Sequence, residues 1–298
     1  MTGNNEATID CLVKKLMEDF AMKDLGSLGF FFGIQETRNS TSLHLQQSKY
    51  VLDLLNKIKM TDAKPYRSLC VLGTKMSKFD SEPFTNPTEY RQVVGALQYA
   101  TLTQPNIAYY VNQLCQHIHN PTSSHWTATK RVLRYLKGSV NCGLLYSKEP
   151  IALHTYCNSD WAGNPDDRRS TSGFGIFLGS SLISWFAKKQ HIVSRSSTEA
   201  EYHSMALATA ELFWLQMLLQ ELHIPLHSPP TSWCDNAGAL TLTSNLVSHA
   251  HTKHIEVDVH FIREKVANKD ISIRYISTLD QVADIFTKGH IVDRFEFL

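Results

Sequence analysis

Hydrophobic and polar positions are patterned most regularly from residue 151 onwards. An apolar and aromatic run over 151–157 leads into a polar segment, which predicts a strand over 153–160. Runs over 170–178 and 181–188, separated by Gly179-Ser180, predict a hairpin. The later patterns predict a helix over 198–222, a strand over 231–235, helices over 236–243 and 252–266, a strand over 271–276 and a helix over 280–288. Residues 252–266 also alternate as a strand would. This order of elements predicts an α/β fold with a mixed sheet.

The first half of the chain has mainly helical patterns. Helices are predicted over 9–20, 89–102, 105–118 and 125–137, and a loop over 61–88. Aromatic residues bracketed by glycines over 28–34 predict either a buried strand or a hairpin. The helix over 125–137 has a basic face, which is either a solvated surface or a contact for phosphates. This face consists of Lys130, Arg131, Arg134 and Lys137.

Four acidic residues stand at element boundaries or on short helices of the second half. Asp160 ends the first strand, Glu201 lies early in the long helix, Asp235 ends a later strand, and Asp284 lies in the last helix. Carboxylate oxygens are the ligands that Mg²⁺ or Mn²⁺ prefers. Four of them can anchor the two ions of a two-metal nuclease site. We therefore expect all four acids to be catalytic residues and metal ligands.

Each acid also has a purely structural interpretation. Asp160 suits a turn at the end of a strand, and Asp235 suits the N-cap of the helix that follows. Glu201 suits a capping box with Thr198. Helical periodicity alone would place Asp284 on a solvated face.

Two neighbouring glutamates compete for the metal-binding position on the long helix. Glu201 is in line with Met205, Ala208 and the leucines that follow at helical spacing, so it should face the core. Glu199 lies about 200° round the helix, which predicts that it faces solvent and joins a cap with Ser196. We expect Glu201 to be the metal ligand.

Several motifs together indicate a known family. They are Thr2-Gly3-Asn4-Asn5, Met22-Lys23-Asp24-Leu25-Gly26, Asp160-Trp161-Ala162-Gly163, Asp235-Asn236, Thr252-Lys253-His254-Ile255 and Phe286-Thr287-Lys288. With these motifs the chain resembles the Pol polyproteins of copia-type retrotransposons. The resemblance implies a truncated reverse transcriptase over 1–82, with a primer-grip-like hairpin and a thumb, and a helical connection segment over 83–150. It also implies a ribonuclease H domain over 151–292, with a mixed sheet and flanking helices.

The resemblance implies an activity as well as a fold. A ribonuclease H hydrolyses the RNA strand of an RNA–DNA hybrid, here with two Mg²⁺ or Mn²⁺ ions held by the four acids. The family's polymerase motif Tyr-Val-Asp-Asp is not in the chain, so reverse transcriptase activity is expected to be absent. The alternative is a catalytically inert remnant that still binds nucleic acid.

Basic and polar residues near the expected site are candidates for contact with the nucleic acid. The basic candidates are Lys188, Lys189, Arg195, Lys253 and His254. Candidates for contact with RNA 2′-hydroxyls are Asn158, Ser196 and Ser197. The histidines between residues 249 and 260 resemble a zinc cluster by count, but no cysteine accompanies them, so zinc is not expected.

Composition changes this picture little. The formal net charge of +1 indicates no class of partner by itself. The six cysteines contain no Cys-x-x-Cys pair, which indicates reduced core thiols in a cytosolic protein. No run approaches the roughly 18 apolar residues of a membrane span, and the polar N-terminus does not resemble a signal peptide. We expect a cytoplasmic or particle-bound protein that acts on nucleic acid and not at a membrane.

Overall fold

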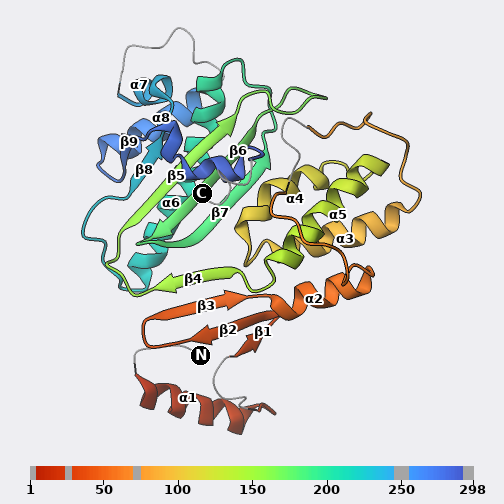
Figure 1. The fold of residues 1–298 in the computed structure, drawn as a ribbon. Helices are drawn as coiled ribbons and strands as arrows, with labels where there is room; N and C mark the ends of the chain where they lie inside the picture. The colour runs from red at the N-terminus through yellow and green to blue at the C-terminus, as the bar shows by residue number, and fades with distance from the viewer. Residues whose placement is uncertain (1–4, 24–28, 70–74, 245–254, 291–298) are drawn as a thin grey trace.

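Figure 1 shows the computed structural model, which describes residues 5–23, 29–69, 75–244 and 255–290. Within these residues the chain forms one sheet of five strands and one of four, with helices packed around them. The expected α/β class, a mixed sheet with flanking helices, is confirmed.

The second half of the chain builds the five-stranded sheet. Side by side, its strands are β7 (Ser181–Lys189), β6 (Thr171–Leu178), β5 (Leu153–Asp160), β8 (Thr231–Cys234) and β9 (Ser272–Tyr275). β5, β6 and β7 form an antiparallel meander, whereas β8 and β9 run parallel to β5. The carboxyl ends of β5 and β8 therefore lie at the same edge of the sheet.

Helices cover both faces of this sheet. α6 (Ser197–Glu221) packs on β5 and β6, with α7 (Ala237–Ser244) and α8 (Glu256–Ala267) against it. Two short 3₁₀ helices, η2 (Thr278–Asp280) and η3 (Val282–Phe286), replace the expected final α-helix. η3 also packs on β5 and β6. In the described part of the segment predicted over 252–266, the helix is observed and not the strand, since α8 spans Glu256–Ala267.

A glycine allows η3 to approach the sheet closely. A Cβ at Gly173 of β6 would lie 2.6 Å from the Cβ of Phe286, so any larger residue would push η3 away. Phe286 is buried and belongs to a core shared with the helical segment before the sheet. This packing places Asp284 on the sheet.

The helical segment packs around a second core. Its helices are α2 (Ser48–Lys57), α3 (Pro87–Ala100), η1 (Pro105–Ile107), α4 (Ala108–Cys115) and α5 (Ser123–Gly138). α4 contacts β7, which joins this core to the five-stranded sheet. Within the described residues, no helix has the length and apolar character needed to cross a membrane.

The N-terminal part forms the four-stranded sheet beside α1 (Glu6–Asp19). Its strands, in order, are β1 (Phe30–Phe31), β2 (Ile34–Arg38), β3 (Ser42–Gln46) and β4 (Gly143–Ser147). Of the two alternatives for residues 28–34, the described residues 29–34 show the hairpin, because Phe32 and Gly33 turn the chain at positive φ. The aromatic side chains are exposed rather than buried, with Phe32 at 74%. β4 was not predicted, and it pairs with β3 about one hundred residues away.

The basic face of α5 contacts the loop that precedes α3. Arg131 donates to the Ser68 carbonyl at 3.2 Å, and Arg134 donates to the Lys64 carbonyl at 2.6 Å. Lys137 donates to the carbonyl of Thr61. These cations stabilise the loop conformation, so a purely solvated surface is the wrong interpretation for three of the four.

Candidate functional site

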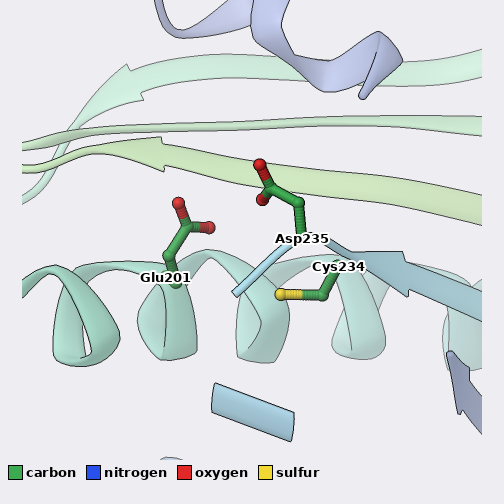
Figure 2. A group of neighbouring side chains, drawn as sticks. All are labelled: Glu201, Cys234 and Asp235. Carbon is green, nitrogen blue, oxygen red and sulfur yellow. The ribbon is translucent and has the colours of Figure 1, made fainter. Parts of the chain in front are cut away.

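Glu201 and Asp235 approach each other at the edge of the five-stranded sheet. Glu201 projects from α6, and Asp235 follows directly after β8. Their ligand atoms and the Cys234 Sγ all lie within 4.8 Å of one another. Figure 2 shows both carboxylates turned to the same side of α6, away from the thiol. We call Glu201 and Asp235 the carboxylate pair.

Burial leaves the carboxylate pair short of partners. Glu201 is 6% exposed, and its Oε2 has no hydrogen-bond partner among the described residues. The pKa of Glu201 is raised well above its usual value, first by burial and then by Cys234 and Asp235. The Ser159 backbone N–H and Lys288 act in the opposite direction on this pKa. A cation near Oε2 would compensate this charge.

The register of α6 explains why Glu201 points inward. Met205, Ala208 and Leu212 on the same stripe are fully buried, as predicted, although Leu222 at the end of the stripe is exposed. The predicted solvent exposure of Glu199 is wrong, because its side chain is also buried, whereas the predicted N-cap at Ser196 is observed. Its carboxylate accepts a hydrogen bond from the Arg195 backbone N–H at 2.8 Å, and so it closes the loop before the helix.

The start of α6 also excludes a capping role for Glu201. Ser196 is the N-cap, and its Oγ accepts from the Glu199 backbone N–H at 3.1 Å. Asp235 has no capping role either, because Asn236 accepts from the Ala239 N–H at 3.0 Å. Both acids of the carboxylate pair are thus available for chemistry.

Side chains of the last segment orient Asp235. Thr278 donates to Asp235 Oδ2 at 2.9 Å, and Gln281 Nε2 lies 3.5 Å from Oδ1. Gln281 is fully buried and also donates to the Cys157 carbonyl at 3.1 Å. These contacts hold Asp235 in place beside the end of β5.

Asp284 lies in η3 and is 5% exposed, so the solvated face expected from helical periodicity is wrong. The tighter 3₁₀ turn changes which side of the segment faces the sheet. Asp284 Oδ1 accepts from the Asn158 side-chain amide and, at 2.7 Å, from the Lys288 ammonium. We call Asn158, Asp284 and Lys288 the amide–lysine group.

The first strand brings Asn158, not Asp160, to Asp284. Asp160 instead accepts from the Thr171 backbone N–H, and its carboxylate lies directly against Gly163. A Cβ at Gly163 would lie 1.5 Å from Asp160 Oδ2, so only glycine fits there. Burial raises the pKa of Asp160 to about 7, while the Thr171 N–H, Lys75 and Lys288 act to lower it. These contacts agree with the structural interpretation of Asp160 as a turn residue at the end of β5.

Asn158 was expected to contact an RNA 2′-hydroxyl, but it is 1% exposed and faces Asp284. A sequence signal for its position was present, since residues 158 and 160 point to the same face of a strand. Lys288 was part of a family motif but had no expected role. Its spacing of four residues from Asp284 was the signal for their ion pair.

The expected nucleic-acid contacts have different environments. Lys188 and Arg195 are exposed, whereas Lys189 forms an ion pair with Asp167 at 2.9 Å. Lys253 and His254 lie outside the described residues. His249 and His251 do too, so three of the four histidines that resembled a zinc cluster are not described. Among described residues, the acidic group with metal-ligand spacing contains no histidine.

The donor set of the carboxylate pair fits one hard divalent cation. Two carboxylates, one of them with a buried oxygen that has no partner among the described residues, are suited to Mg²⁺ or Mn²⁺. The amide–lysine group does not fit a second cation in the same way, because an amide N–H and an ammonium already contact the carboxylate oxygen of Asp284. The two groups thus differ in their capacity for a metal ion.

The chain is similar in fold to solved ribonuclease H domains. The N-terminal ribonuclease H domain of Rv2228c from Mycobacterium tuberculosis, solved as a fusion with maltose-binding protein, covers 50% of this chain and 96% of its own. It is 12% identical, with a TM-score of 0.34. No protein-family model matches the chain.

Two retrotransposon proteins match nearly the whole chain. The retrovirus-related Pol polyprotein from transposon RE1 of Arabidopsis thaliana is 45% identical over 289 residues, which are 97% of this chain and 20% of that polyprotein. The corresponding polyprotein from transposon TNT 1-94 of Nicotiana tabacum is 35% identical over 306 residues, 99% of this chain and 23% of that polyprotein. The chain thus spans about a fifth of the length of these relatives. It belongs to the retrovirus-related Pol polyproteins of copia-type retrotransposons.

Proposed function

We propose that the chain acts on RNA–DNA hybrids through a ribonuclease H-type centre that hydrolyses the RNA strand. The observation that carries this proposal is the carboxylate pair, in which Glu201 and Asp235 meet at one sheet edge with a buried oxygen left without a partner. Asp284 is the third acid of the proposed centre, and Asn158 stands where the first strand meets it.

In this proposal Glu201 and Asp235 hold a divalent cation. A bound Mg²⁺ or Mn²⁺ supplies Lewis-acid stabilisation of charge on a phosphoryl oxygen. The chain's own residues orient the ligands: Thr278 and Gln281 fix Asp235, and the buried stripe of α6 fixes Glu201. Besides burial, the nearby Asp235 carboxylate contributes to the raised pKa of Glu201, and a bound cation would offset this repulsion.

A basic groove supports the choice of nucleic acid as substrate. It has a volume of about 1290 Å³ and lies between the helical segment and the five-stranded sheet. Its cationic lining residues are Lys64, Lys75, Lys130, Arg131, Arg134 and Lys288. Such a groove suits a phosphate backbone, with affinity that falls as salt rises. Lys188 and Arg195 are exposed and are proposed as outer contacts to the same backbone.

Binding without hydrolysis is the second candidate function, and one observation favours it. An amide, Asn158, occupies the place where a two-metal site would need a carboxylate, and Asp284 already contacts Lys288. A domain of this kind could still bind the hybrid in the basic groove.

A paired assay separates the two candidates. The chain is incubated with a labelled RNA–DNA hybrid and with matched DNA duplex, and binding is measured in Ca²⁺ by gel shift. Cleavage is then measured in Mg²⁺ and Mn²⁺. Slow cleavage of the RNA strand that Glu201→Gln removes supports hydrolysis, whereas tight binding with no cleavage in either metal supports the second candidate. No binding to the hybrid would contradict both.

A further inference from the structure

Asn158 is wholly committed to contacts inside the protein. Its amide nitrogen donates to Asp284 Oδ1 and, at 2.9 Å, to Thr287 Oγ1. Its amide oxygen accepts from the Ser159 backbone N–H at 2.8 Å. Because the residue is 1% exposed, both polar ends of the amide are satisfied without water.

Lys288 contacts the same oxygen of Asp284. Its Nζ lies 2.7 Å from Oδ1, and the two residues are four apart along the chain. Asp284 Oδ1 therefore receives one neutral and one charged donor. These donors stand where a divalent cation would have to approach that oxygen.

The identity of residue 158 decides whether this arrangement is possible. An amide presents N–H groups to Asp284, which a carboxylate cannot do. A carboxylate at position 158 would place two anionic oxygens at hydrogen-bond distance, a contact that needs a cation or a proton between them. Replacing the amide of residue 158 by a carboxylate thus creates a need for a cation or a proton beside Asp284.

We infer that Asn158 and Lys288 together take the place of a second divalent cation, so that the natural chain holds one cation and Asn158→Asp creates the site for another. This inference rests on the proposed function for the role of the cations in hydrolysis. The carboxylate pair keeps its own site, because its unsatisfied oxygen belongs to Glu201 and not to the amide–lysine group.

Counting bound Mn²⁺ tests the inference without measuring activity. Mn²⁺ binding to the full chain is followed by electron paramagnetic resonance and calorimetry for the natural protein and for Asn158→Asp. We expect one ion in the natural protein and two in the variant. The control Asp160→Asn removes a carboxylate from the same strand outside both groups, and it should still bind one ion.

A swapped variant guards against a folding failure. In Asn158→Asp/Asp284→Asn the carboxylate and the amide exchange places, so their hydrogen bond is preserved and one ion is expected. Asn158→Asp alone should gain more in melting temperature from Mn²⁺ than the natural protein does. Two ions in the natural protein, one ion in a folded Asn158→Asp, or an Asn158→Asp that does not fold even in Mn²⁺ would overturn the inference.

Hybrid cleavage then distinguishes this inference from the proposed function. We expect Asn158→Asp to cleave at least about tenfold faster than the natural chain, since changes around metal ligands alter activity by about 10–100-fold. If the variant gains an ion but cleaves no hybrid, the proposed hydrolysis is wrong and the inference stands. If both proteins bind one ion and cleave at the same rate, the inference is wrong and the proposed hydrolysis stands.

Discussion

The carboxylate pair and the amide–lysine group lie around the same strand end, but their charges are balanced differently. In the pair, Glu201 and Asp235 face each other, and one buried oxygen has no partner among the described residues. In the group, Asp284 is already matched by Asn158 and Lys288. In the proposed centre the first arrangement has room for an added cation, whereas the second already contains the Lys288 ammonium.

The difference shows that acidic residues in the order expected of a nuclease do not make a metal site by themselves. What matters is which donors approach each carboxylate oxygen. Glu201 is buried with its Oε2 unpartnered among the described residues, whereas Asp284 is buried with the Lys288 ammonium on its Oδ1. The following substitutions perturb one group at a time.

Loss of Glu201 should have the largest effect. In the Asn158→Asp background, Glu201→Gln should lower the rate of hybrid cleavage at least about 100-fold. Mutating a residue that only contacts a metal ligand already lowers activity by about 10–100-fold, and Glu201 is itself a proposed ligand. Its melting temperature should stay the same or rise, since burial raises the pKa of this carboxyl and makes its ionised form costly. Single-turnover cleavage and thermal melts measure both. An active Glu201→Gln would show that the pair is not the centre.

Gly173→Ala should disturb the amide–lysine group and spare the carboxylate pair. The added Cβ would lie 2.6 Å from Phe286, so η3 must shift, at a cost of about 1–3 kcal/mol in the free energy of unfolding. Mn²⁺ affinity of the natural single site should be retained. Urea unfolding and calorimetry test this.

A matched control for Gly173→Ala is available in α3. At Gly95 a new Cβ would meet nothing within 4 Å, so Gly95→Ala should stabilise the helix by about 0.5–1 kcal/mol. If both substitutions lowered the free energy of unfolding equally, close packing of η3 on Gly173 would not explain the effect of Gly173→Ala.

Asp160→Asn should change how stability depends on pH. Burial raises the pKa of Asp160 from 3.8 to about 7, so the folded state binds this proton more tightly than the unfolded state. The natural protein therefore gains stability from Asp160 as pH falls from 8 to 5, on the order of 1–2 kcal/mol after a discount for partial solvent exposure. The variant should lack this gain. The lowered pKa values of His117 and His125 change stability in the opposite sense. Their contribution is the same in both proteins, so the difference between the two pH profiles removes it. Parallel pH profiles would contradict the assignment.

Glu199→Gln should have the smallest effect. Among the described residues its carboxylate accepts one loop N–H, from Arg195, and a glutamine oxygen can accept the same bond. The expected cost is at most about 1 kcal/mol, with cleavage retained in the Asn158→Asp background. If Glu199→Gln were inactive and Glu201→Gln were active, the inward register of α6 would be wrong.

The sequence by itself determined most of the second half of the fold. Alternation located β5, β6 and β7, and helical spacing located α6 and the inward position of Glu201. These patterns are local, because each residue's face follows from its nearest neighbours along the chain. The sequence did not predict β4 or the 3₁₀ form of η3, since the first needs a distant partner strand and the second depends on packing against Gly173.

Only the tertiary structure decided which residue of β5 lies beside Asp284. Asn158 and Asp160 point to the same face, so periodicity cannot separate them. They differ by two positions, roughly 6.6 Å along the strand. The crossing of η3 over β5 places Asp284 beside Asn158, while Asp160 lies at the loop against Gly163. A short-range pattern defines the face of a strand, but the depth at which another segment crosses it is set by contacts between residues more than one hundred positions apart.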